Sequence, residues 1–406
     1  LLISAGNTPD AHWHEHPSSC QSSSVQDPGQ SWNALTVGAS TQFASLPVER
    51  YPDWLLVASK GDVSPFSRTS SNWQRPWPLK PEIVVEGGNC AIDPVDGKGR
   101  TVDELSLLTT YRTPTVRAFS LSAMTSAATA LAVRYAAILQ ARYPDFWPET
   151  IRALLVHSAE WTDAMKKHFL PLNTREQKEK LLRYCGYGNP DFTRACWSAT
   201  NHLTLVAQDS FQPYKKEEST YKTKAINYHN LPWPTAVLRD LRGTLVKLRV
   251  TLSYFIEPNP ARRGWKGRYR YASHALRFEV QTPTETKEEF KRRVNSAARE
   301  EEEDENQGYQ GDAADWELGP QLRHLGSIHS DWWEGTAAEL ANRNMIAVYP
   351  VVGWWRERHH LGRWNKQARY SLVVTIQTPS EEVDIYTPVQ IQISSKVSVE
   401  IPIDGD

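Results

Sequence analysis

The chain has 406 residues, which is enough for two or three domains with cores of their own. Its formal net charge of −1 gives no reason to expect a nucleic-acid partner or a membrane surface. Four cysteines (Cys20, Cys90, Cys185 and Cys196) form no CxxC pair, which favours a reducing compartment and hence a cytoplasmic location. No apolar run reaches the about twenty residues of a membrane span.

The first residues are predicted to form a buried strand that begins at or before residue 1. Leu1–Ser4 is apolar, and Ala5-Gly6-Asn7 predicts the turn that ends it. The chain has no initiator Met, so we expect that an N-terminal part of the natural protein precedes it. Asn7 is either a turn former or an amide aimed into a cleft.

Three histidines alternate in the segment that follows. In an extended conformation His12, His14 and His16 would share one face, and such a cluster can bind zinc. Pro17 and the serines behind it favour a polar surface loop instead. The zinc interpretation also needs a fourth ligand, which the sequence does not identify.

Short apolar runs then alternate with helical patterns, which indicates an α/β sheet. Strands are predicted over 34–39, 54–58 and 80–88, and a helix over 148–159. The stretch 120–140 begins with small and hydroxyl residues and continues as a helix so apolar that we expect it to be buried on nearly all sides. His157 lies in the later helix, where a packed core residue is a better interpretation than a catalyst.

Thr125 and Ser126 fall where the first turn of the central helix should begin. The free backbone N–H groups and the positive end of the helix dipole would stabilise negative charge on an oxygen there. Ser126 could instead simply cap the helix.

From about residue 203 the pattern becomes β-rich, which predicts a β-sandwich. A charged helix with an acidic tract, near 286–315, reads as a solvated insertion. Two tryptophan pairs, Trp332-Trp333 and Trp354-Trp355, either line a binding surface or pack between sheets. Strands are predicted over 203–206, 246–252, 275–280, 345–350, 370–376 and 389–393.

Six short segments of the first half carry motifs that follow one another in a fixed order. They are Ser4-Ala5-Gly6-Asn7, Thr36-Val37-Gly38-Ala39, Ser64-Pro65-Phe66-Ser67, Lys80-Pro81-Glu82-Ile83-Val84, Thr125-Ser126-Ala127-Ala128 and Tyr187-Gly188-Asn189-Pro190. In that order they resemble the SAGN, VGA, SxFS, KPDIV, TSxA and GxGxVN motifs of subtilisin-like serine peptidases. The first 200 residues therefore resemble the C-terminal half of a subtilase catalytic domain. The inserted loops and β-rich extension resemble bacterial intracellular members.

The resemblance implies an α/β fold: a three-layer subtilisin-like domain with a mostly parallel sheet over 1–205, lacking its N-terminal part. An all-β sandwich domain over 206–406 would follow. It implies a serine endopeptidase that needs no cofactor or metal and acts on polypeptides, with Ser126 as nucleophile and Asn7 in the oxyanion hole. Gly38 and Thr125 would contact substrate. The sandwich is a candidate surface for a protein partner.

The same resemblance places the catalytic Asp and His before residue 1, because the family order is Asp, His, Ser. Without them the chain should hydrolyse little or nothing. A second departure is Met124, which stands where the family has Gly. The alternative is therefore a degenerate pseudopeptidase that serves as a protein-binding or scaffold module.

Overall fold

The computed structural model describes residues 1–74, 77–196, 202–260, 271–303, 316–379 and 398–402. The chain divides into two compact units with mixed α and β structure and several sheets. Unit 1 holds Leu1–Phe146 and Leu154–Cys196, and unit 2 holds Trp147–Ala153 and Trp197–Asp406. The chain enters unit 2 at 146/147, returns to unit 1 at 153/154 and enters unit 2 again at 196/197. The division at 205/206 stays a prediction.

Unit 1 is built on a parallel three-stranded sheet, in the order β1-β2-β4, against which helix α2 packs. The strands predicted near 1–4, 34–39 and 80–88 are confirmed as β1, β2 and β4. The elements of unit 1 are β1 (Leu2–Ser4), η1 (Asp10–Glu15), α1 (Ser18–Ser22), β2 (Leu35–Ser40), β3 (Leu55–Leu56), β4 (Ile83–Glu86), β5 (Ala91–Ile92), β6 (Gly99–Arg100), η2 (Asp103–Leu105), β7 (Leu107–Thr110), β8 (Phe119–Ser122), α2 (Met124–Arg142), β9 (Ala159–Glu160), α4 (Asp163–Lys167), α5 (Arg175–Cys185), β10 (Asn189–Pro190) and α6 (Phe192–Cys196).

The core of unit 1 includes an apolar cluster between β4 and the helices α4 and α5. Val84 of β4 packs there with Leu181, Tyr184 and Cys185 of α5 and with Met165 of α4. All four cysteines of the chain are buried and none forms a disulfide.

Helix α2 departs from the prediction that nearly every side is buried. Five of its residues are buried, including Thr125 and Leu139, but Val133 is 46% exposed and Ile138 36%. The exposed residues of α2 recur every three or four positions and so form a stripe, which consists of Ser126, Ala130, Val133, Arg134, Ala137, Ile138, Ala141 and Arg142. Strand β1 also lies at the edge of its sheet, where β2 is its only partner among the described residues. Unit 1 thus presents a largely apolar stripe of α2 and an unpaired edge of β1.

Unit 2 contains two antiparallel four-stranded sheets, in the orders β11-β19-β15-β17 and β16-β18-β14-β20. The predicted strands are confirmed, except that 389–393 lies outside the described residues. The elements are β11 (His202–Phe211), β12 (Tyr214–Glu217), β13 (Thr220–Thr223), β14 (Ala225–Asn230), α7 (Thr235–Asp240), β15 (Leu245–Tyr254), β16 (Ala275–Val280), α8 (Lys287–Glu303), α9 (Pro320–Arg323), β17 (Ile328–Thr336), α10 (Ala337–Leu340), β18 (Met345–Val351), α11 (Trp354–Glu357), η3 (His359–Leu361), β19 (Ala368–Gln377) and β20 (Ser398–Pro402).

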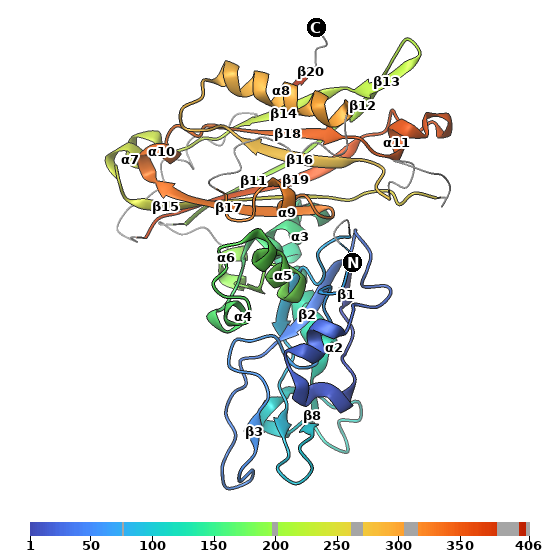
Figure 1. Ribbon diagram of the computed structural model, residues 1–406, viewed down its shortest axis with the longest axis vertical. Coiled ribbons are helices and arrows are strands. Elements are labelled where there is room, and N and C mark those ends of the chain that lie inside the picture. The colour runs from blue at the N-terminus through green and yellow to red at the C-terminus, as the bar shows by residue number, and fades with distance from the viewer. Residues whose placement is uncertain (75–76, 197–201, 261–270, 304–315, 380–397, 403–406) are drawn as a thin grey trace. The chain divides into compact units, whose positions relative to one another are not determined.

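The predicted charged insertion is more closely integrated than expected. Helix α8 runs along the sheet that holds β14, β16 and β18 (Figure 1). Its Phe290, Val294 and Ala298 recur every fourth residue and are fully buried in the core of that sheet. The idea of a purely solvated insertion is therefore wrong for 287–298, and residues 304–315 lie outside the described residues.

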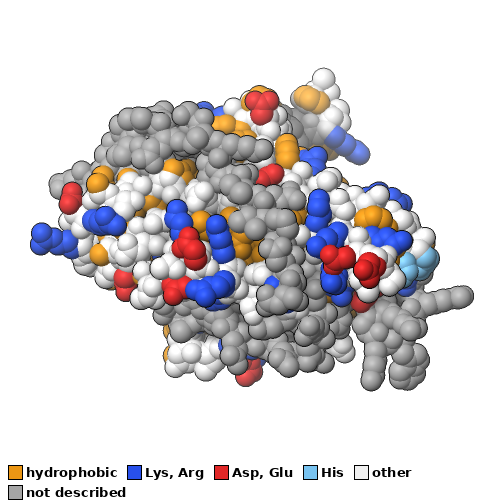
Figure 2. Space-filling model, turned by 90° about the horizontal axis from the view of Figure 1, so that it is seen from above, with side chains coloured by type: hydrophobic (Ala, Val, Ile, Leu, Met, Phe, Trp, Pro, Cys, Tyr) orange, Lys and Arg blue, Asp and Glu red, His pale blue; other side chains and the backbone are white. Residues whose placement is uncertain are grey.

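The tryptophan pairs belong mainly to the core. Trp333, Trp354 and Trp355 are buried, which confirms packing rather than a binding surface for these three. Trp332 is partly exposed, and the Lys247 ammonium and Arg249 guanidinium each lie 5.2 Å from its ring centre. In Figure 2, basic and acidic side chains are intermixed over the coloured part of the face shown. No helix of the described residues has the length and apolarity needed to span a bilayer.

Helix α3 (Pro148–His157) is shared between the two units, since its residues up to Ala153 are assigned to unit 2. Arg152 donates from Nη2 to the carbonyl oxygens of Tyr254 and Ser327, at 2.7 and 2.6 Å, and from Nε to Ser253 Oγ at 3.0 Å. Thr150 Oγ1 lies 2.9 Å from Ser371 Oγ. The first half of the helix is thus tied by hydrogen bonds to strands of unit 2.

Candidate active site

Asn7 stands directly after β1, at a sharp turn of the chain. Gly6 has a φ of +89°, which a side chain would disfavour. The Asn7 backbone forms a bridge with Ser67, and its carbonyl oxygen accepts a hydrogen bond from Arg68 Nε at 2.7 Å. The loop around Ser64–Ser67 therefore holds the Asn7 backbone in place.

The side chain of Asn7 meets the start of helix α2, 118 residues further along the chain. Its Oδ1 accepts hydrogen bonds from Thr125 N at 3.1 Å and from Thr125 Oγ1 at 2.7 Å. A backbone N–H can only donate, so the amide oxygen must face Thr125. The Nδ2 group, with two protons to donate, therefore points away from Thr125.

Ser126 is exposed in the first turn of α2. The N-cap is Ala123, which makes no side-chain capping bond, so the alternative that Ser126 caps the helix is wrong. Among the described residues no hydrogen bond to the Ser126 hydroxyl is present. Its N–H lies among those at a helix start that have no partner within the helix. The arrangement combines an accessible hydroxyl with donors and a positive dipole end beside it.

Met124 occupies a conformation that normally belongs to glycine. Its φ is +75°, and its N–H donates to the Gly87 carbonyl oxygen at 2.6 Å. A Cβ at Gly87 would approach Ala39 Cβ to 2.5 Å and Met124 O to 3.0 Å. The glycine after β4 thus lets the start of α2 come close, while Met124 itself carries backbone strain.

The two predicted substrate-binding residues have different surroundings. Thr125 is fully buried, and its N–H and hydroxyl are both used to hold Asn7. Gly38 lies within β2, where a Cβ would come within 2.7 Å of Ser67 Oγ and 2.8 Å of Pro81 Cγ. Close packing accounts for this glycine, and a role in substrate binding stays a prediction.

The histidines of the N-terminal segment do not form the predicted extended face. Residues 10–15 form the 3₁₀ helix η1, so His12 and His14 are not aligned with His16 by strand alternation. His12 instead pairs with Glu15 at the surface. His157 is buried near the end of α3, as expected of a core histidine.

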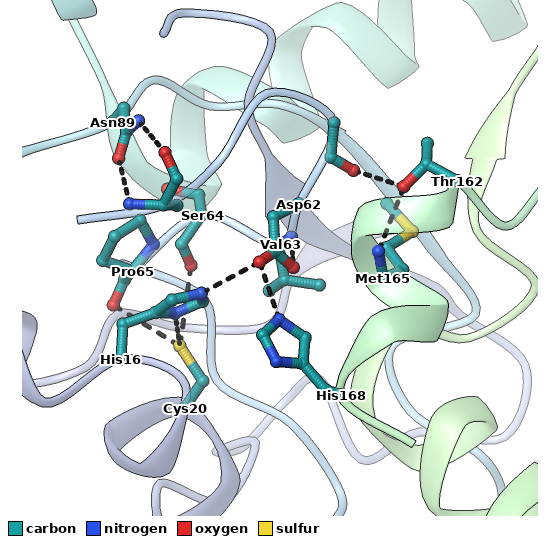
Figure 3. Close-up of polar contacts among 12 residues, drawn as sticks. His16, Cys20, Asp62, Val63, Ser64, Pro65, Asn89, Thr162, Met165 and His168 are labelled. Atoms are coloured by element: carbon teal, nitrogen blue, oxygen red, sulfur yellow. Dashed lines mark hydrogen bonds and ion pairs between the residues drawn. The ribbon is translucent and has the colours of Figure 1, made fainter. Parts of the chain in front are cut away.

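One group of polar side chains was not predicted as a set. His16, Asp62 and His168 meet inside unit 1, although they come from three separate segments (Figure 3). The sequence singled out His16 alone, and no spacing rule connects it to residues 46 and 152 positions away.

Comparison with known proteins agrees with the geometry of the first unit. Residues 1–188 match the sequence profile of the peptidase S8 family, described as the subtilase family. An uncharacterized protein of Sinorhizobium fredii, y4bN, is 27% identical over 188 residues, which cover 45% of this chain and 42% of that protein. This match thus spans less than half of that curated relative. The N-terminal part of the chain is therefore similar to serine peptidases.

Proposed function

We propose that the protein is a serine endopeptidase of the subtilisin type that forms an acyl-enzyme at Ser126. The observation that carries this proposal is the pair of hydrogen bonds from Thr125 to Asn7 Oδ1. They place the Asn7 amide at the start of the helix that carries the exposed Ser126. A polypeptide substrate fits this chemistry.

In the proposed reaction the Ser126 oxygen attacks the scissile carbonyl carbon while a general base takes the hydroxyl proton. The Asn7 Nδ2–H and the Ser126 N–H donate to the oxyanion of the tetrahedral intermediate. The intermediate collapses with cleavage of the C–N bond, and the proton passes to the leaving amine. Water then releases the acyl group by the reverse sequence of proton transfers.

The general base and its aspartate partner are proposed to come from polypeptide that is not in this 406-residue sequence. The exposed stripe of α2 and the unpaired edge of β1 support this, because such surfaces are normally covered in a folded domain. Additional chain seated there would complete a larger, mostly parallel sheet with helices on both sides.

For unit 2 we propose that the two four-stranded sheets pack as a β-sandwich and serve as a surface for a protein partner. The buried faces of both sheets support the packing, since Leu248, Val250 and Leu252 of β15 and Phe278 of β16 are fully buried. The four free buried cysteines support a reducing, cytoplasmic location.

A second candidate function is a pseudopeptidase that keeps the fold and binds protein without cleaving it. Met124 favours this alternative, because a side chain at φ +75° stands beside the residues that would hold the substrate.

The strain at Met124 is measurable. We expect Met124→Gly to be more stable than Met124→Ala by about 1 kcal/mol, because only glycine adopts this φ without strain. At an ordinary helix position alanine is instead more stabilising than glycine, by about 1 kcal/mol. Urea unfolding measures the free energy of unfolding of both variants. Both lack the methionine side chain beyond Cβ, so the comparison isolates the effect of the backbone conformation. Greater stability of the alanine variant would show that residue 124 is unstrained.

The proposed function is tested by active-site labelling with a fluorophosphonate. The protein expressed from its complete reading frame should be labelled, and Ser126→Ala should abolish the label, while Ser122→Ala, a serine on β8, should not. The 406-residue chain alone should not react. The reading frame should also encode D-T-G and H-G-T segments upstream.

Two results would contradict the proposal. An unlabelled but folded complete protein would favour the pseudopeptidase. Labelling of the 406-residue chain at Ser126 would place the base within this sequence instead.

A further inference from the structure

A buried group of two histidines and one aspartate lies inside unit 1. It shares no residue with the candidate active site of Asn7, Thr125 and Ser126. His16 follows η1, Asp62 lies in the loop after β3, and His168 is the C-cap of α4. Asp62 Oδ2 is 3.4 Å from His16 Nε2 and 2.7 Å from His168 Nε2 (Figure 3). The three side chains are 2%, 5% and 19% exposed for His16, Asp62 and His168 respectively. Their ligand atoms all lie within 4.8 Å of one another.

The hydrogen bonds leave a single carboxylate oxygen to face both rings. Asp62 Oδ1 accepts from Val63 N at 2.7 Å, so Oδ2 serves both imidazoles. As a carboxylate, Asp62 can only accept hydrogen bonds. Each facing nitrogen must carry a proton, or a cation must lie between the three groups.

Cys20 contacts this group from the other side of the His16 ring. Its Sγ is 3.6 Å from His16 Nδ1 and equally far from the carbonyl oxygens of Ser64 and Pro65. Cys20 is completely buried, and the two carbonyl oxygens are available as acceptors for its S–H. When the thiol donates to a carbonyl, His16 Nδ1–H can donate to sulfur. The lone pair of Nε2 then faces Asp62, which is the arrangement that a metal-binding histidine needs.

We propose that His16, Asp62 and His168 bind one zinc ion through Nε2, Oδ2 and Nε2. Two imidazole nitrogens and a carboxylate oxygen are ligands that zinc accepts, each at about 2.0–2.2 Å. Two such atoms on a tetrahedral ion lie roughly 3.4 Å apart. The His16–Asp62 distance of 3.4 Å already matches this spacing. His168, at 2.7 Å and the least buried of the three, would move outward to admit the ion.

The site would join segments that the chain keeps far apart. Asp62 leads directly into Ser64–Ser67, and Ser67 forms a bridge with Asn7. A zinc ion would therefore stabilise the loop that holds Asn7, while taking no part in the reaction at Ser126. Three protein ligands leave a fourth position, which water would fill. Cys20 supports the ring of His16 and is not itself a ligand.

The test begins with the 406-residue chain, stripped of metal by a chelator. We expect one equivalent of zinc to rebind in competition with a chromophoric chelator. His168→Ala should weaken zinc affinity by at least about tenfold. Mutation of a residue that only supports a metal ligand already lowers affinity by about that factor, and His168 would be a ligand itself. The double variant His12→Ala/His14→Ala is the matched control and should keep full affinity. Cobalt should give visible d–d bands without an intense thiolate band.

Each other outcome overturns the proposal. Zinc affinity of the wild type no greater than that of His168→Ala would leave only a hydrogen-bonded network. Loss of zinc in the His12/His14 variant would move the metal to the N-terminal histidines, and a thiolate band would make Cys20 a ligand. If His168→Ala fails to fold, zinc should still raise the melting temperature of both the wild type and the double variant, and no shift would refute the site.

Discussion

Replacing Asn7 by alanine is expected to lower the kcat of the complete peptidase about 100- to 1000-fold with little change in KM. That range is the one known for the corresponding donor in subtilisin. The Asn7 amide would donate to an oxyanion that exists only in the transition state, so its loss affects kcat rather than substrate binding. Steady-state hydrolysis of a peptide substrate, with far-UV circular dichroism as the check on folding, provides the measurement.

Thr125→Val is the matched control for this prediction. It removes the 2.7 Å bond from Oγ1 to Asn7 but keeps the 3.1 Å bond from the backbone N–H. Asn7 would be held less firmly but would still donate to the oxyanion. We therefore expect kcat to fall about tenfold, which corresponds to roughly one neutral hydrogen bond. If both variants lose the same amount of kcat, or if Asn7→Ala leaves kcat unchanged, Asn7 does not act in the oxyanion hole.

Lys80→Met is expected to destabilise unit 1 by about 3–5 kcal/mol. Lys80 and Glu82 form an ion pair in the core, with side-chain exposures of 0% and 3%. Lys80 Nζ also donates to the Ala34 carbonyl oxygen at 2.9 Å, and Glu82 Oε2 accepts from Thr36 N at 2.7 Å. Removal of the ammonium takes the Lys80 charge away from a buried carboxylate. Urea unfolding followed by tryptophan fluorescence measures the change.

Two further variants show whether burial of the unpaired charge is the cause. Lys80→Met/Glu82→Gln removes both charges and should recover much of the lost stability. Arg100→Met breaks a surface pair with Asp93, where Arg100 is 50% exposed, and should cost less than about 1 kcal/mol. A Lys80 variant no less stable than Arg100→Met would contradict the expected role of the buried pair.

The sequence predicted those features that depend on residues close together in the chain. Alternation and apolar runs located β2, β15, β16 and β18 because each strand buries side chains of its own segment. The order of motifs also anticipated that Asn7 and Ser126 belong to one region. The hydrogen bonds between Asn7 and Thr125 agree with that expectation.

Features that depend on distant partners could not be predicted. Strand alternation was the wrong period for His12–His16, since η1 turns these residues about a helical axis. Asp62 and His168 have no local signal that links them to His16. The exposed stripe of α2 was missed because an apolar helix predicts that it will be covered without showing which chain covers it.

Helix α3 limits how the two units can be separated. A cut after Cys196 would leave Trp147–Ala153 with the wrong fragment, and Arg152 would lose its acceptors on Tyr254 and Ser327. The complementary fragment would keep those carbonyl groups without their donor. No single cut therefore yields two self-contained modules. Trp147–Ala153 precedes the rest of unit 2 in the chain but belongs to it. Evolution could therefore not add, remove or replace the β-rich region as one continuous piece. The two units are expected to be inherited together.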